Sequence, residues 1–160
     1  MKQEISPTRN SRRDFLALLG IGGIGLLSSA LFPQRSFATV DETLEAIDKL
    51  TRGKAPVEDK VRFEELPKIA ENGNVVPCTI SVDSPMTDQD YVKAIHILAE
   101  GNPKPGVATF HLTPESGKAW VRVRMRLADT QNVVAVAEMS DGAMYIAKQK
   151  IKVTIGGCGG

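Results

Sequence analysis

The chain has 160 residues and a nearly balanced charge, with 20 lysines and arginines against 19 aspartates and glutamates. Five of the basic and two of the acidic residues lie in residues 1–38, which leaves 15 basic and 17 acidic residues in the remainder. A mildly acidic remainder lacks the basic field that nucleic acid requires, which argues against nucleic-acid binding. Residues 39–160 are enough for one domain with a single modest core.

The first 38 residues have the pattern of an export signal. Arg12 and Arg13 form a twin-arginine signature, and an apolar, uncharged run follows from residue 16 to about residue 32. A membrane span needs ~20 apolar residues, whereas this run is shorter and contains four glycines. Residues 36–38 (Ser-Phe-Ala) then offer the small residues of a signal-peptidase site. We expect residues 1–38 to be a cleaved twin-arginine signal that directs the protein to the periplasm; an uncleaved membrane anchor is the alternative.

The remainder reads as one short helix followed by strands. Residues 41–50 predict the helix, because Leu44, Ile47 and Leu50 recur at helical spacing and the acidic first turn suits the helix dipole. Seven strand-like segments with frequent turn signals follow, at residues 61–63, 75–82, 91–99, 107–112, 119–127, 132–139 and 143–155. This pattern predicts an all-β, immunoglobulin-like antiparallel β-sandwich with an N-terminal helix. We assign residues 39–154 to this domain and residues 155–160 to a flexible C-terminal arm.

The C-terminal arm has the sequence Ile-Gly-Gly-Cys-Gly-Gly, which places Cys158 between two pairs of glycines. Gly156, Gly157, Gly159 and Gly160 have no Cβ, so they predict a slim and mobile tether that fits into a narrow slot. The thiolate is the reactive form of cysteine, and an exposed thiol has a pKa of ~8.5. We therefore expect the arm to carry Cys158 into the active sites of other proteins. A frayed end without a function is the alternative.

The other cysteine, Cys78, occupies a different environment. It shares one face of an alternating segment with Val76, Ile80 and Val82, which predicts a small, inert core residue. A disulfide between Cys78 and Cys158 would pin the arm and consume its thiol, so we disfavour it although the domain is expected to be exported.

Histidines and arginines form two other groups of side chains that could take part in binding. His96 and His111 are the two histidines, and we expect them to be structural, since no nearby Cys or Asp completes a metal-ligand set. Arg122, Arg124 and Arg126 form a basic stripe beside Trp120. The stripe predicts a solvated strand face, and docking of a partner is the alternative. The sequence offers no catalytic residues, no metal site and no cofactor site.

Several segments together carry a family resemblance. These are the ending of residues 153–160, Asp-Ser-Pro-Met-Thr at residues 83–87, and residues 96–103, 108–114 and 130–142. They resemble the SoxY family, the sulfur-carrier subunits of the periplasmic thiosulfate-oxidising Sox system, over most of residues 72–160. Cys78 departs from the family pattern, because a plain apolar residue is expected at this position. Its thiol could therefore be a second reactive group, and this alternative stays open.

The resemblance implies a carrier and not an enzyme. Cys158 would be the covalent attachment site, and SoxZ, a second small β-domain subunit, would form a heterodimer with this chain. The implied transient partners are the c-type cytochrome SoxAX, the dimanganese hydrolase SoxB and the sulfane dehydrogenase SoxCD. No cofactor is implied for the carrier itself.

Two other classes of function remain as alternatives. A secreted β-sandwich module for binding, or one linked to a metal, would have an incidental tail and would leave the terminal cysteine unexplained. A ubiquitin-like sulfur carrier also ends in Gly-Gly, but it would be cytoplasmic and would not need Cys158.

Overall fold

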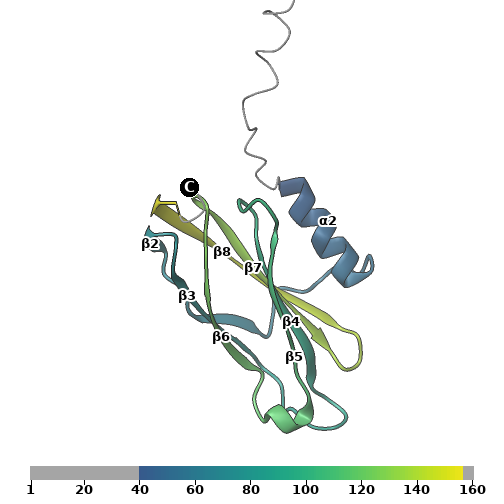
Figure 1. The fold of residues 1–160 in the computed structure, drawn as a ribbon. Coiled ribbons are helices and arrows are strands. Elements are labelled where there is room, and N and C mark those ends of the chain that lie inside the picture. Colours follow the sequence, from purple (N-terminus) through teal and green to yellow (C-terminus); the bar gives the residue numbers. More distant parts are fainter. Residues whose placement is uncertain (1–39, 157–160) are drawn as a thin grey trace, which may run out of the picture. The chain divides into compact units, whose positions relative to one another are not determined.

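The computed structural model describes residues 40–156, which form one α-helix, eight β-strands and one short 3-10 helix (Figure 1). The elements are, in chain order, α2 (Val40–Thr51), β1 (Val61–Glu65), β2 (Ile69–Asn72), β3 (Val76–Val82), β4 (Val92–Ala99), β5 (Gly106–His111), η1 (Pro114–Ser116), β6 (Trp120–Met125), β7 (Gln131–Met139) and β8 (Met144–Ile155). Among these residues, no helix is both long enough and apolar enough to cross a membrane.

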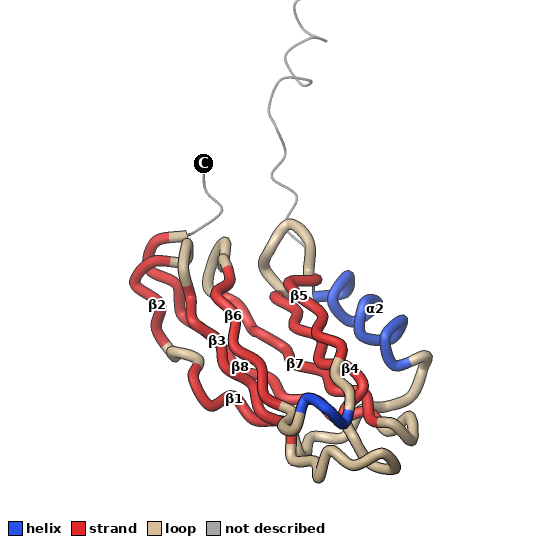
Figure 2. The backbone as a smooth tube through the Cα atoms, turned by 60° about the horizontal axis from the view of Figure 1, so that its bottom comes forward, coloured by secondary structure: helices blue, strands red, loops and turns tan. Residues whose placement is uncertain are grey.

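The strands form two sheets that face each other (Figures 1 and 2). The smaller sheet has the order β1-β3-β6, and the larger has the order β2-β8-β7-β4-β5. Neighbouring strands are antiparallel in both sheets, with the exception of β2, which runs parallel to β8. The predicted all-β sandwich with a leading helix is therefore confirmed, with one parallel pair that the sequence did not predict.

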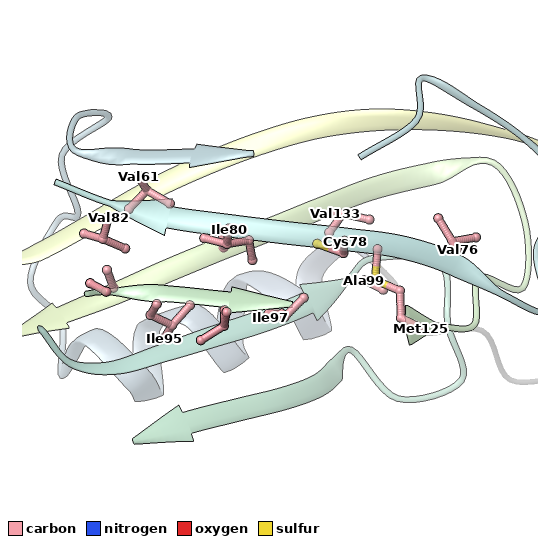
Figure 3. Close-up of a cluster of buried hydrophobic side chains, with 14 of the residues drawn as sticks. Val61, Val76, Cys78, Ile80, Val82, Ile95, Ile97, Ala99, Met125 and Val133 are labelled. Carbon is pink, nitrogen blue, oxygen red and sulfur yellow. The ribbon is translucent and has the colours of Figure 1, made fainter. Parts of the chain in front are cut away.

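The core lies between the two sheets and follows from the alternation of each strand (Figure 3). On β3, Val76, Cys78, Ile80 and Val82 are all buried, as their shared face predicted. They pack against apolar side chains of the larger sheet, including Ile95, Ile97, Val133 and Ile151. Each fully buried Val or Ile contributes about 1.5–3 kcal/mol relative to an exposed one, so this layer supplies most of the stability of the domain.

Helix α2 covers part of the outer face of the larger sheet. Its residues Ala46, Ile47 and Leu50 pack on a small outer cluster formed by Leu98, Val134 and Val136. Leu44 was expected on the same face, but it is 56% exposed, because the buried side of the helix begins at Thr43 and continues through Ala46 and Ile47. The helix therefore covers the part of the outer face that Leu98, Val134 and Val136 form.

Strand β2 was missed by the sequence analysis. It has only four residues, and of these only Ala70 is buried, so it carries no alternation that could mark a strand. Its partner in the sheet is the end of β8, about 80 residues further along the chain. The pairing is important because it extends the hydrogen-bonded part of β8 as far as Ile155.

Candidate functional site

The residues expected to act directly lie outside the described part of the chain. This holds for Cys158, Gly157, Gly159 and Gly160, and for the signal residues Arg12 and Arg13. Of the C-terminal arm, the structure describes Ile155 and Gly156. It therefore shows the base from which the arm leaves the domain.

The last residues of β8 pair first with β7 and then with β2. The pairing of β8 with β7 reaches as far as Ile151, which lies opposite Gln131. Beyond this point β2 takes over, with Ile69 opposite Lys152 and Asn72 opposite Ile155. The backbone N–H of Gly73 donates a hydrogen bond to the carbonyl oxygen of Ile155 at 2.7 Å, which closes the ladder. Ile155 is thus a strand residue, although it was assigned to the arm.

Thr130 secures the same stretch of β8 from the other side. The backbone N–H of Val153 donates to the Thr130 hydroxyl at 3.0 Å, and that hydroxyl lies 3.4 Å from the carbonyl oxygen of Val153. The Thr130 side chain takes the place of a backbone partner, because the pairing of β8 with β7 ends at Ile151. The backbone polar groups of Val153 therefore keep hydrogen-bond partners.

Gly156 is exposed to solvent on one side, and on the other it lies against the backbone of Ala128. A Cβ atom at this position would overlap with the carbonyl oxygen of Ala128 and would lie 3.3 Å from its carbonyl carbon. Only glycine fits there, because a backbone carbonyl cannot move aside as the end of a flexible side chain can. Gly156 was expected to belong to the mobile tether; the structure places it against the domain, where it acts as the anchor of the arm.

A polar network holds Ala128 in place. Asn102 is its centre: its Oδ1 accepts from the backbone N–H of Ala128 at 2.9 Å, and its Nδ2 donates to the carbonyl oxygen of Arg126 at 2.8 Å. Gln131 donates to the same Asn102 oxygen at 3.1 Å and accepts from the backbone N–H of Gly101 at 2.7 Å. The loop before β7 and the loop after β4 are thereby fixed to each other beside Gly156.

The sequence analysis did not assign a role to Asn102, Ala128, Thr130 or Gln131. Three of these lie in segments that carry the family resemblance, at residues 96–103 and 130–142. The segments are far apart in the sequence but meet at the base of the arm. The proximity of these segments could have pointed to the site, but it can be inferred only when the strand topology is known.

The surface next to the anchor is basic on one side. Lys148, Lys150 and Lys152 alternate along β8 on the side opposite its buried residues, and with Lys68 and Thr130 they line a surface pocket of about 620 Å³. Lys148 is bound by the buried Glu100 at 2.5 Å, and Asn132 donates to the other Glu100 oxygen at 2.5 Å. Lys68, Lys150 and Lys152 form no ion pair with any residue of the described chain.

Exposed apolar side chains also lie near the base of the arm. Ile155 is 63% exposed and belongs to the last residues of β8, while Val75, in the turn between β2 and β3, is 61% exposed. Ile69, at the start of β2, is 61% exposed as well. The surface around the end of β8 therefore carries exposed apolar side chains beside the lysines.

Cys78 behaves as predicted. Its side chain is fully buried in the core, and its thiol is free. Burial raises the pKa of this thiol to about 11, because the thiolate would lose its hydration. At neutral pH Cys78 is therefore a protonated, inaccessible thiol and a poor nucleophile.

The two histidines lie on neighbouring strands, β4 and β5. His96 is buried, and its Nδ1 lies 3.0 Å from the hydroxyl oxygen of Thr109. Burial lowers the pKa of His96; the carboxylate of Glu138 opposes this effect, and His111 adds to it. No group of three or more His, Cys, Asp or Glu side chains within residues 40–156 is arranged to hold a metal ion.

The arginine stripe lies on the smaller sheet. Arg122 forms an ion pair with Glu65, and its Nε also donates to the Thr79 hydroxyl at 3.3 Å. Trp120 donates to Glu64 at 2.9 Å. Hydrogen bonds from Arg122 and Thr79 hold the pKa of Glu65 below its usual value. The start of the stripe thus combines one exposed ion pair with side-chain hydrogen bonds on a solvated strand face, as the sequence predicted.

Comparison with known proteins gives one family and one fold. The model of the family described as sulfur oxidation protein SoxY matches residues 47–158. The sulfur carrier protein SoxY from Chlorobium limicola f thiosulfatophilum is 33% identical, with a TM-score of 0.59 over 73% of this chain and 100% of that chain. A superoxide reductase (neelaredoxin) from Ignicoccus hospitalis is 19% identical, with a TM-score of 0.53 over 72% of this chain and 94% of that chain. The second likeness concerns the fold alone. No curated protein matches the chain.

Proposed function

The chain belongs to the SoxY family and is a sulfur carrier of the Sox system, and from this premise we propose that Cys158 is the site at which it carries sulfur. The observation that carries the proposal is the family match, which runs through to residue 158. The buried position of Cys78 supports it, since that thiol is unsuited to accept cargo.

The chemistry of loading follows from the thiol. The Cys158 thiol and thiosulfate are coupled to a cysteine S-thiosulfonate, with loss of one proton and of two electrons to the c-type cytochrome SoxAX. The dimanganese hydrolase SoxB then releases the terminal sulfonate as sulfate and leaves a persulfide on the cysteine. Where SoxCD is present, it oxidises the remaining sulfur before a second hydrolysis restores the thiol. The carrier supplies the attachment atom and the tether, and its partners supply the catalysis.

The anchor at Gly156 supports this role by defining the length of the tether. Cys158 follows Gly156 by two residues, so its Cα can lie at most about 7 Å from the anchor. A partner enzyme that attacks the cargo must therefore bring its reacting atoms close to the end of β8. A fixed anchor limits the number of positions that the thiol can sample, which lowers the entropy lost when the arm enters an active site.

We further propose that the protein works in the periplasm, paired with SoxZ. The family implies the Sox system and, in general, the SoxZ partner. The unpaired edge strands at both ends of each sheet are surfaces that a second β-domain can cover. A heterodimer of this kind buries on the order of 1,200–2,000 Å². Replacement of Arg12 and Arg13 by lysine is expected to leave both subunits in the cytoplasm, which fractionation of cells would show.

Intact-mass spectrometry of the native carrier tests the proposal. We expect added mass on the C-terminal peptide after growth on thiosulfate, and we expect a reductant to remove it. Cargo on the peptide that contains Cys78 would contradict the assignment of Cys158. Elution of the chain as a lone monomer at micromolar concentration, with SoxZ present, would contradict the proposed pairing.

A further inference from the structure

Both sheets place basic side chains at the end of the domain from which the arm leaves. Five exposed ones form no ion pair within residues 40–156, and we call them the basic collar: Lys68, Lys104, Arg124, Arg126 and Lys152. The acidic side chains at this end are Glu71, Asp129 and Glu100, and Lys148 neutralises Glu100. This end is therefore basic, although residues 39–160 as a whole carry 15 basic and 17 acidic residues.

One part of the collar lies on the loops beside Gly156. Arg126 precedes Ala128, against which Gly156 packs, by two residues, so the Cα atoms of Arg126 and Ala128 are at most about 7 Å apart. Lys104 follows Asn102 by two residues, and Asn102 binds the backbone of both Arg126 and Ala128. These loops lie at the same end of the molecule as the turn between β2 and β3 (Figure 2).

The other part of the collar lies on the larger sheet. The backbone N–H of Lys152 donates to the carbonyl oxygen of Lys68 at 2.9 Å, so these two residues are neighbours across the sheet. Lys152 is four residues from Gly156, a distance of about 13 Å along the strand. The collar therefore contains side chains of both sheets on either side of the anchor.

The length of the tether determines where a partner enzyme binds. Two residues separate Cys158 from Gly156, which allows at most about 7 Å between their Cα atoms. An active site that holds the thiol must therefore lie against this end of the domain. A transient contact buries less than about 1,200 Å² in total, or about 600 Å² on each partner, which corresponds to a disc of about 14 Å in radius. Centred on Gly156, such a disc includes Arg126 and Lys152.

We propose that the basic collar is the surface on which the enzymes that process the cargo dock, and that it fits an acidic rim around the slot that receives the arm. The proposal rests on the function proposed above and names the chemistry of the partner surface. Charges at the rim of an interface mainly raise the rate of association and contribute little to the lifetime of the complex. Such a surface suits a carrier that must find several enzymes in turn and leave each of them.

Two arginines of the smaller sheet supply a matched pair of variants. Arg126 belongs to the collar, whereas Arg62 lies on β1 opposite Ser81, which in turn lies opposite Trp120. Trp120 precedes Ala128 by eight residues, or about 26 Å along the strand, so Arg62 lies outside the contact area. Both arginines are exposed and form no ion pair with a described residue. Arg126→Glu and Arg62→Glu therefore change the net charge equally, and neither should unfold the domain.

The experiment uses the reduced SoxYZ heterodimer loaded by tetrathionate. The Cys158 thiolate attacks an inner sulfur of tetrathionate, thiosulfate leaves, and the S-thiosulfonate forms without any other oxidant. The hydrolase SoxB is the probe, and release of sulfate is measured against the concentration of loaded carrier. Because the carrier is already loaded, a change in the pKa of the thiol does not affect the measurement. Each variant is measured at low salt and at about 0.5 M salt, where the Debye length is about 4 Å.

We expect Arg126→Glu to raise KM for the loaded carrier about tenfold at low salt and to leave kcat unchanged, because the collar acts on the encounter of the two proteins. Arg62→Glu should change KM by less than about twofold, since it lies beyond the Debye length from the contact. At high salt, the two variants and the parent carrier should have the same KM. Both variants should elute with SoxZ as the heterodimer.

Three results would overturn the inference: equal KM values for the two variants at low salt, a lower KM for Arg126→Glu than for the parent carrier, or loss of the heterodimer in Arg126→Glu. The second result would show that the partner surface is basic, and the third would assign the collar to SoxZ. Sulfate release from a Cys158→Ser carrier, or none from the loaded parent carrier, would instead contradict the proposed function. The two failures can therefore be told apart.

Discussion

The carbonyl oxygen of Ala128 occupies the space in which a Cβ atom of residue 156 would lie, so only glycine can stand there. This contact divides the glycines of the C-terminal arm into two kinds. Gly156 is required by the packing against Ala128, whereas we propose that Gly157 and Gly159 are required for entry into partner enzymes. The two requirements can be separated by experiment.

Gly156→Ala is expected to destabilise the domain by about 1–3 kcal/mol, because the added methyl group forces the backbone of Ala128 or β8 to shift. Thermal unfolding measures the effect. Gly106→Ala is the matched control, since a Cβ at that position meets no atom within 4 Å. Equal stability of the Gly156→Ala and Gly106→Ala variants would show that the contact with Ala128 does not constrain the arm.

Replacement of both Gly157 and Gly159 by valine should leave the domain stable and the Cys158 thiol accessible to a small reagent. Valine adds β-branched bulk and restricts φ, so turnover of the loaded carrier by its partner enzymes should collapse. Thiol titration and thiosulfate-dependent turnover are measured on the same sample. Near-normal turnover in the double variant would show that a slim tether is not needed.

Asn102→Ala should loosen the base of the arm, because Asn102 supports Ala128, Arg126 and Gln131 at once. Loss of these hydrogen bonds in a partly buried site is expected to lower the free energy of unfolding by about 1–3 kcal/mol. Lys104→Ala, a change of an exposed residue in the same loop, serves as the control. Hydrogen exchange of the amides of Ala128 and Val153 should rise in Asn102→Ala alone; unchanged exchange there would contradict the role of the network.

The two cysteines should differ sharply in reactivity. Burial raises the pKa of Cys78 to about 11, so at pH 8 only about one molecule in a thousand carries its thiolate. A brief exposure of the folded protein to iodoacetamide at pH 8 should therefore label Cys158 and spare Cys78, and both should be labelled in denaturant. Peptide mass spectrometry gives the ratio. Comparable labelling of both cysteines in the folded protein would mean that Cys78 is accessible.

The same shift has a consequence for stability. The folded-state pKa of Cys78 lies above its ordinary value of 9.0, so the protonated thiol is favoured by folding. Its contribution to stability is complete below pH 9 and declines as the pH rises from 9 towards 11. Cys78→Ala should be less sensitive to pH in this window than the parent protein, and denaturant titrations at pH 8 and pH 10.5 would test this.

The strands could be predicted where alternating burial of side chains produces an alternating apolar pattern in the sequence. The face shared by Val76, Cys78 and Ile80 identified β3 and the environment of its cysteine, and both assignments are confirmed. Strand β2 could not be found in this way, since its pairing with β8 depends on backbone hydrogen bonds between distant segments. Leu44 misled the analysis of the helix, because helical spacing does not distinguish which stripe of the helix faces the sheet.

The candidate site, too, could be predicted from the sequence only in part. Composition alone pointed to the glycines and to Cys158, but it could not separate Gly156 from the others, because a clash with a backbone carbonyl leaves no trace in the sequence. Asn102 and Gln131 carried no recognisable motif either. Their role depends on the pairing of β4 with β7, in which Ala99 lies opposite Val133 and which brings the loop after β4 to the start of β7.

The most direct test of the account compares Cys158→Ser with Cys78→Ala in thiosulfate oxidation by the reconstituted Sox system. Cys158→Ser should abolish thiosulfate-dependent electron transfer while circular dichroism and heterodimer formation stay unchanged, and Cys78→Ala should retain turnover. Intact-mass spectrometry should find cargo on the Cys78→Ala protein and none on Cys158→Ser. Retained turnover in Cys158→Ser, or cargo found on Cys78, would contradict the claim that Cys158 is the carrier residue.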